Sequence, residues 1–175
     1  MIADFVRGRQ ILAYEEPVQQ GIRLHRAIDD FTDRHEATRR GCSFFRPVCG
    51  AYGMVFMDVV YDHFLANDPR YFSQQSLERF AKDTYLMLEA AEEALPDRFL
   101  MVFRYMRSEN WLLSYRSMQG IHQAFRGITR RAKYLDNQTD TFAVMERHYT
   151  ELEKCYESFM PDLYDFVQEK ISQPD

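Results

Sequence analysis

The chain of 175 residues has few of the residues that tight turns require, with only 7 glycines and 6 prolines. This scarcity disfavours a turn-rich all-β fold. No apolar run approaches the ~20 residues of a membrane-spanning helix. The first ten residues, MIADFVRGRQ, lack the apolar core of a signal peptide. We therefore expect neither a β-rich fold nor a membrane partner.

Cysteine is also scarce. Cys42, Cys49 and Cys155 are odd in number and lack the spacing of a zinc site. We interpret them as reduced thiols, which predicts a cytoplasmic protein. Hydrophobic residues nevertheless make up 46% of the chain. That content and length suit one domain, residues 1–175, with a sizeable core.

Apolar residues recur at helical spacing through almost the whole chain, which predicts an all-α fold, a single helical bundle of six or seven helices. The expected helices cover 17–34, 35–44, 51–66, 76–95, 97–117, 121–134 and a final segment from about 142 to 166. Breaks are expected around Pro47 and Gly50, at Gly120, and at Pro161, which should kink the last helix or start a new one. Trp111, in the sequence ENWLLSYR, is expected to pack in the core rather than to line a groove.

The final segment has apolar residues at alternating steps of three and four, as in a heptad seam. These residues are Phe142, Met145, Tyr149, Leu152, Tyr156, Phe159, Leu163 and Phe166. The pattern favours a core-facing helix over a coiled-coil dimer, so the oligomeric state stays open.

Positive charge is concentrated in the middle of an acidic chain. Residues 97–133 hold eight basic and two acidic residues, a net charge of +6, whereas the whole chain carries −5. This asymmetry indicates a site for an anionic ligand or an acidic partner. The alternative is that these arginines pair with the acidic C-terminal helix.

Two predicted helices carry acidic and imidazole side chains at intervals of four, which places them on one helix face. His25, Asp29 and Asp33 form the first ladder. Asp58 and Asp62, followed by His63, form the second, within the otherwise apolar stretch VFMDVVYDHFLAND. Burying carboxylates there is costly unless they are paired or bind a cation.

If the two ladders face each other, they could hold a metal ion. Carboxylate and imidazole ligands without a thiolate favour Mn²⁺, Mg²⁺ or Fe²⁺ over structural zinc, and such an ion supports phosphoester hydrolysis. Purely structural roles stay open as alternatives: a His–Asp hydrogen bond is often structural, Asp33 could cap a helix, and Asp29 could pair with Arg26.

Four stretches in this order, IADFVRG, GIRLHRAIDDFTDRH, MDVVYDHFLA and NWLLSYRSMQGI, resemble the acyl carrier protein phosphodiesterases, and the likeness extends from residue 1 to about 165. The resemblance implies an all-α, HD-domain-like phosphohydrolase that uses Mn²⁺. Its expected reaction is hydrolysis of the phosphodiester between 4′-phosphopantetheine and a serine of acyl carrier protein, with metal-bound water or hydroxide as the nucleophile.

The resemblance also assigns roles to residues. It implies that Asp4, His25, Asp62 and His63 lie closest to the metal. Asp29, Asp33 and Asp58 are expected to be further ligands or groups that orient a histidine. Two alternatives stay open: a related phosphohydrolase of a small nucleotide or other phosphoester, and a catalytically impaired protein that binds the carrier protein.

The basic segment then has an expected partner, since acyl carrier proteins are strongly acidic; no nucleic acid partner is expected. Arg126, Arg130, Arg131 and Lys133 are expected to steer the carrier protein. Arg7, Arg23 or Arg26 would contact the phosphodiester.

One departure from the family pattern concerns the N-terminus. Family members begin further upstream, with a helix of the pattern Asn-(aromatic)-Leu-Ala-His. Here Met1 stands immediately before IADFVRG. We therefore expect this chain to lack that helix and its histidine, a candidate metal ligand.

Overall fold

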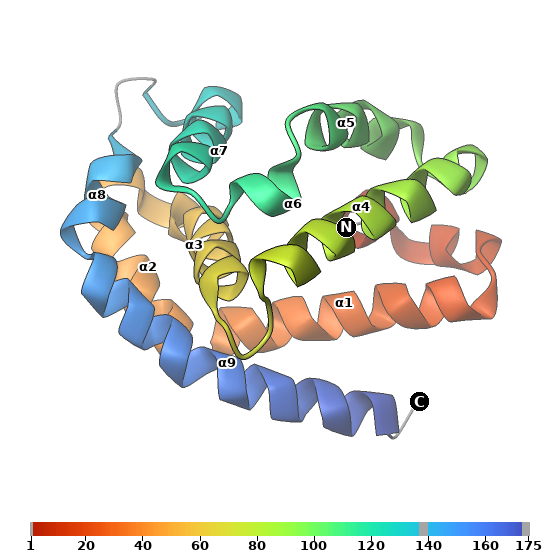
Figure 1. Ribbon diagram of the computed structural model, residues 1–175, viewed down its shortest axis with the longest axis horizontal. Coiled ribbons are helices and arrows are strands. Elements are labelled where there is room, and N and C mark those ends of the chain that lie inside the picture. The colour runs from red at the N-terminus through yellow and green to blue at the C-terminus, as the bar shows by residue number, and fades with distance from the viewer. Residues whose placement is uncertain (1, 137–139, 173–175) are drawn as a thin grey trace.

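The computed structural model describes residues 2–136 and 140–172, which form nine α-helices, four short 3₁₀ turns and no strand. The predicted all-α fold is confirmed (Figure 1). The α-helices are α1 (Glu16–Arg34), α2 (Glu36–Cys49), α3 (Gly53–Asn67), α4 (Gln74–Ala90), α5 (Asp97–Ser108), α6 (Trp111–Ser114), α7 (Met118–Arg131), α8 (Thr141–Arg147) and α9 (Tyr149–Ser172). The 3₁₀ turns are η1 (Ala3–Phe5), η2 (Gly8–Ala13), η3 (Gly50–Tyr52) and η4 (Glu92–Ala94).

The helix count of six or seven was too low because two expected helices are each divided. The expected helix 97–117 ends at Ser108, and Asn110, at φ 47°, turns the chain into α6. Asparagine tolerates this left-handed conformation better than most residues. The final segment is divided at His148, between α8 and α9.

The break expected around Pro47 and Gly50 is confirmed at Gly50, whereas Pro161 and Gly120 are not helix boundaries. Pro161 lies inside α9 and does not start a new helix. Pro47 likewise lies inside α2, which ends at Cys49, and the break comes at Gly50, where φ is 56°. Each proline removes one backbone donor, and packing of the surrounding residues outweighs that loss. Gly120 does not separate two helices: it lies in the first turn of α7, where its N–H donates to the Ser117 hydroxyl at 3.0 Å.

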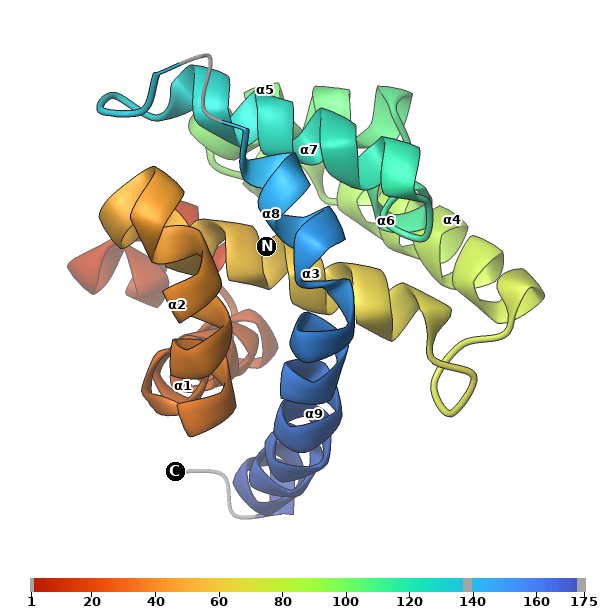
Figure 2. The same cartoon turned by 90° about the vertical axis from the view of Figure 1, so that its left-hand side faces the viewer.

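The apolar helix α3 is the centre of the main core. Figure 2 shows it crossing the molecule, with α7 above it and with α2 and α9 below, and all three helices contact it. Phe56, Met57 and Val60 of α3 are fully buried. Gly41 lets α2 and α3 lie close together, because a Cβ atom at this position of α2 would lie only 2.5 Å from the Met57 side chain of α3.

The heptad-spaced residues of the C-terminal segment face this core, as predicted. Met145, Leu152, Tyr156 and Phe159 are buried in it. The Tyr156 hydroxyl also donates to the buried Asp68 carboxylate at 2.8 Å. All three cysteines are free thiols.

The N-terminal segment is held against α1. Ala3 and Val6 pack on Ile22 of α1, and the Arg26 guanidinium donates to the Val6 carbonyl at 2.6 Å. Turn η1 thereby fixes the position of Asp4 beside α1. Among residues 2–136 and 140–172, no helix is both long and apolar enough to cross a membrane.

Candidate active site

Three of the predicted site residues come together where the N-terminal segment meets α1. Asp4 of η1 and His25 and Asp29 of α1 each offer a ligand atom, and these atoms all lie within 4.8 Å of one another. His25 Nδ1 lies 3.0 Å from an Asp29 oxygen. The i, i+4 spacing on α1 produces this pair, and the Arg26–Val6 hydrogen bond brings Asp4 to it.

The second ladder faces the first. Asp58 and Asp62 of α3 are exposed to solvent and line a cavity. Burial raises the pKa of Asp62 to about 7. Burial also raises the pKa of Asp58 to about 7, with further contributions from the negative charges of Asp62, Asp29, Asp33 and Asp4. Five carboxylates of α1, α3 and η1 therefore act on a single region.

The contacts of the α1 ladder exclude two of its purely structural roles. Asp29 pairs with His25 and not with Arg26, whose guanidinium binds the Val6 carbonyl. Asp33 is not the cap of α2: that position belongs to His35, whose Nδ1 accepts from the Ala37 N–H at 3.2 Å. Asp33 lies near enough for its charge to act on Asp58.

His63 does not join this group, contrary to its expected place beside the metal. It is buried, and its Nδ1 lies 2.8 Å from the Tyr115 carbonyl while its Nε2 lies 2.9 Å from the Tyr149 hydroxyl. A carbonyl can only accept, so Nδ1 carries the proton and Nε2 accepts from Tyr149. Neither ring nitrogen is free to bind a metal ion. Burial lowers the pKa of His63, which favours the neutral ring in this core position.

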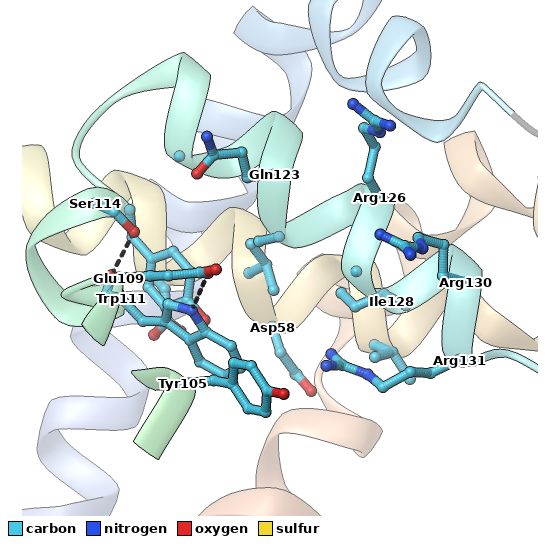
Figure 3. Close-up of a pocket in the computed structure, with 17 residues that line it drawn as sticks. Asp58, Tyr105, Glu109, Trp111, Ser114, Gln123, Arg126, Ile128, Arg130 and Arg131 are labelled. Carbon is cyan, nitrogen blue, oxygen red and sulfur yellow. Dashed lines mark hydrogen bonds between the residues drawn. The ribbon is translucent and has the colours of Figure 1, made fainter. Parts of the chain in front are cut away.

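The carboxylates of α3 form part of the wall of a cavity of about 850 Å³. Its lining includes Val55, Val59 and Ile128. Figure 3 shows Asp58 between two contrasting sides, with Arg126, Arg130 and Arg131 of α7 on one and with Tyr105, Glu109 and Trp111 on the other. This volume lies within the range of small-molecule sites.

The arginines of α7 have no carboxylate within ion-pair distance among residues 2–136 and 140–172. The alternative that they pair with the C-terminal helix is therefore not realised in that part of the chain. The N-terminal arginines differ: Arg23 bonds Glu16 and Gln19, and Arg26 bonds Val6, whereas Arg7 is exposed where η2 begins.

The donor set fits a divalent cation. Asp4, His25 and Asp29 supply oxygen and nitrogen atoms without a thiolate, the combination that suits Mn²⁺, Mg²⁺ or Fe²⁺. Asp58 and Asp62 add negative charge, and neither has an ion-pair partner among the described residues. A divalent cation held here would balance these charges.

Sequence reasoning missed the aromatic side of the cavity. Trp111 packs against the hydrophobic cluster of α4 and α5, as expected, but it also lines the cavity with Tyr105 and Glu109. The signal was present, since Glu109 and Asn110 directly precede the tryptophan and indicate a turn rather than a continuous helix.

Fold and site together define an all-α protein in which carboxylates of α3 line a cavity bordered by arginines, and an imidazole and two further carboxylates gather where η1 meets α1. Residues 1–163 match the acyl carrier protein phosphodiesterase family. The chain belongs to this family. It is 33% identical to the acyl carrier protein phosphodiesterase of Enterobacter sp. (strain 638), over 99% of this chain and 89% of that protein.

Two further relatives have the same name. The Escherichia coli O45:K1 protein is 33% identical over 97% of this chain and 89% of its own length. The Salmonella paratyphi A protein is 32% identical over 92% of this chain and 84% of its own length. No solved structure shows a significant match to the chain.

We predict that Asp58→Asn stabilises the metal-free protein above neutral pH. The pKa of Asp58 in the folded protein, about 7, lies above its ordinary value of 3.8. The folded state therefore binds more protons than the unfolded state between these values, and stability falls as the pH rises through that window. The variant's gain in unfolding midpoint, measured with a chelator present, should grow from about pH 4 to about pH 8.

The matched control is Asp83→Asn on α4, an exposed aspartate that does not line the cavity. It should show no such pH-dependent gain. A loss of stability in Asp58→Asn at the higher pH would contradict the electrostatic description of the site.

Proposed function

We propose that the protein is a metal-dependent phosphodiesterase that acts on holo acyl carrier protein. Water adds across the phosphodiester between 4′-phosphopantetheine and the carrier serine. Its hydroxyl joins phosphorus, its proton goes to the serine oxygen, and the bond between phosphorus and that oxygen breaks. The products are apo carrier protein and 4′-phosphopantetheine. The names of the relatives support this substrate.

The observation that carries the proposal is the convergence of carboxylates from η1, α1 and α3 on one region, whose α3 members line a cavity. Asp4, His25 and Asp29 have ligand atoms within 4.8 Å of one another, and the charges of Asp4 and Asp29 act on Asp58 across the site. Such a concentration of negative charge repels a phosphodiester unless a cation lies between them. The site thus needs a cation for the proposed substrate to approach.

Each group has a defined task in the proposed reaction. Asp4, His25 and Asp29 would hold the cation, with Mn²⁺ as the expected ion. When bound, such an ion polarises a phosphoryl oxygen and lowers the pKa of water. Asp58 and Asp62 face the cavity and can accept hydrogen bonds from the attacking water, which orients it towards phosphorus. Asp33 adds negative charge beside them.

The partner would dock at the arginine side of the cavity. Arg126, Arg130 and Arg131 are exposed, and no carboxylate of the described residues neutralises them. An acidic carrier protein is attracted to such a surface, and its serine-linked phosphodiester would then lie next to the carboxylates of α3.

We predict that Asp29→Asn abolishes most of the hydrolysis. Loss of this carboxylate removes one candidate ligand and the partner of His25, so the rate should fall by roughly 10- to 100-fold or more. Mass spectrometry of holo acyl carrier protein incubated with Mn²⁺ measures the loss of phosphopantetheine directly. A chelator should stop the wild-type reaction.

The control is Asp30→Asn, the neighbouring aspartate on α1, which pairs with Arg34 at 2.7 Å and is not part of the group formed by Asp4, His25 and Asp29. Its rate should equal that of the wild type. Equal rates for all three proteins would contradict the assigned site. Turnover of small phosphoesters or nucleotides, without turnover of the carrier protein, would contradict the assigned substrate.

We also predict that the double change Arg130→Glu and Arg131→Glu raises KM for the carrier protein. Charge reversal replaces attraction by repulsion, so KM should rise roughly tenfold at low salt and less at high salt. Steady-state kinetics at two ionic strengths measure both effects. Arg79→Glu with Lys82→Glu on α4 is the matched control, because both residues are exposed and lie outside the cavity. An equal rise in KM for both double variants would refute docking at α7.

A further inference from the structure

One side of the cavity consists of residues that the proposed hydrolysis does not use. Tyr105 lies on α5, Glu109 follows α5, and Trp111 begins α6. All three line the cavity, across Asp58 from the arginines of α7 (Figure 3). We call Tyr105, Glu109 and Trp111 the aromatic wall.

The aromatic wall is held in a defined geometry. The Trp111 indole N–H donates to a Glu109 carboxylate oxygen at 2.9 Å. Asn110, in the left-handed conformation between them, makes the turn that places both side chains. The backbone N–H of Leu112 donates to the Tyr85 hydroxyl at 3.0 Å, which attaches α6 to α4. These contacts fix the indole ring before any ligand arrives, as a preformed binding surface requires.

A close helix approach sets the distance between the aromatic wall and the arginines. A Cβ atom at Gly120, in the first turn of α7, would lie only 2.0 Å from the Ser114 carbonyl oxygen of α6. Only glycine permits this approach. Helix α7 therefore starts against α6, and its arginines follow along the other side of the same cavity.

The two sides of the cavity favour ligand groups of different charge. The aromatic wall offers two ring systems, and its one charged group, Glu109, is negative. An anion is disfavoured there, whereas an uncharged chain can pack on the rings and donate an amide N–H to the carboxylate. The pantetheine part of the proposed substrate is such a chain, since it is uncharged and carries two amides.

We propose that the aromatic wall binds the pantetheine arm of the substrate, with Tyr105 and Trp111 packing against the arm and Glu109 fixing the indole. This inference rests on the proposed function. It assigns the three surfaces of the cavity to three parts of one substrate. The carboxylates face the phosphodiester, the arginines face the acidic carrier protein, and the aromatic wall faces the neutral arm.

The chain reports on this binding directly, because Trp111 is its only tryptophan. Titration of the full chain with pantetheine, which has no phosphate and no carrier protein, should produce a saturable change in tryptophan fluorescence. Tyr105→Ala retains the tryptophan but removes a packing surface, so the dissociation constant should rise roughly fivefold. Tyr164→Ala on α9, an exposed tyrosine outside the cavity, should leave it unchanged.

Three results would overturn the inference: no saturable change with pantetheine, the same change with inorganic phosphate, or equal weakening by Tyr105→Ala and Tyr164→Ala. The titration is independent of turnover. Hydrolysis of holo carrier protein without a pantetheine response would leave the proposed function intact and refute the aromatic wall. A saturable, Tyr105-dependent pantetheine response without hydrolysis would support the wall and refute the function.

Discussion

Repulsion among carboxylates that share one partly dehydrated region is the constraint on which the rest of this structure depends. Loss of solvation and the negative charges of Asp62, Asp29, Asp33 and Asp4 together raise the pKa of Asp58. Packing of the surrounding core offsets the cost of this repulsion. Fully buried side chains of α3, packed on α2, α7 and α9, stabilise the helix that bears Asp58 and Asp62.

Structural contacts elsewhere serve to hold the cavity in shape. Arg26 fastens the N-terminal segment so that Asp4 lies beside His25 and Asp29. Gly120 lets α7 begin against α6, which places arginines opposite the aromatic wall. His63 belongs with these contacts, since its bonds to Tyr115 and Tyr149 connect α3 to the segment after α6 and to α9. The site is thus assembled from short segments that long helices position.

Much of this structure could be predicted from residue spacing. The apolar periodicity gives the all-α class, and the i, i+4 ladders place His25 with Asp29 and Asp58 with Asp62. Spacing does not show which way a side chain at a helix edge points, so His63 was placed with Asp62 although its ring enters the core. Nor does it show that Asn110 divides α5 from α6, because that depends on a single backbone conformation. Because the position of Trp111 depends on this turn, residue spacing did not predict that the aromatic wall lines the cavity.

The most direct test of the account is a crystal structure with Mn²⁺, with the ion located by its anomalous scattering. We expect a peak bordered by Asp4, His25 and Asp29, on the side of the cavity where Asp58 and Asp62 lie. The same peak should be lost in crystals of Asp29→Asn and kept in Asp30→Asn. A peak elsewhere, or no peak in a wild-type crystal saturated with Mn²⁺, would contradict the claim that these carboxylates form the catalytic centre.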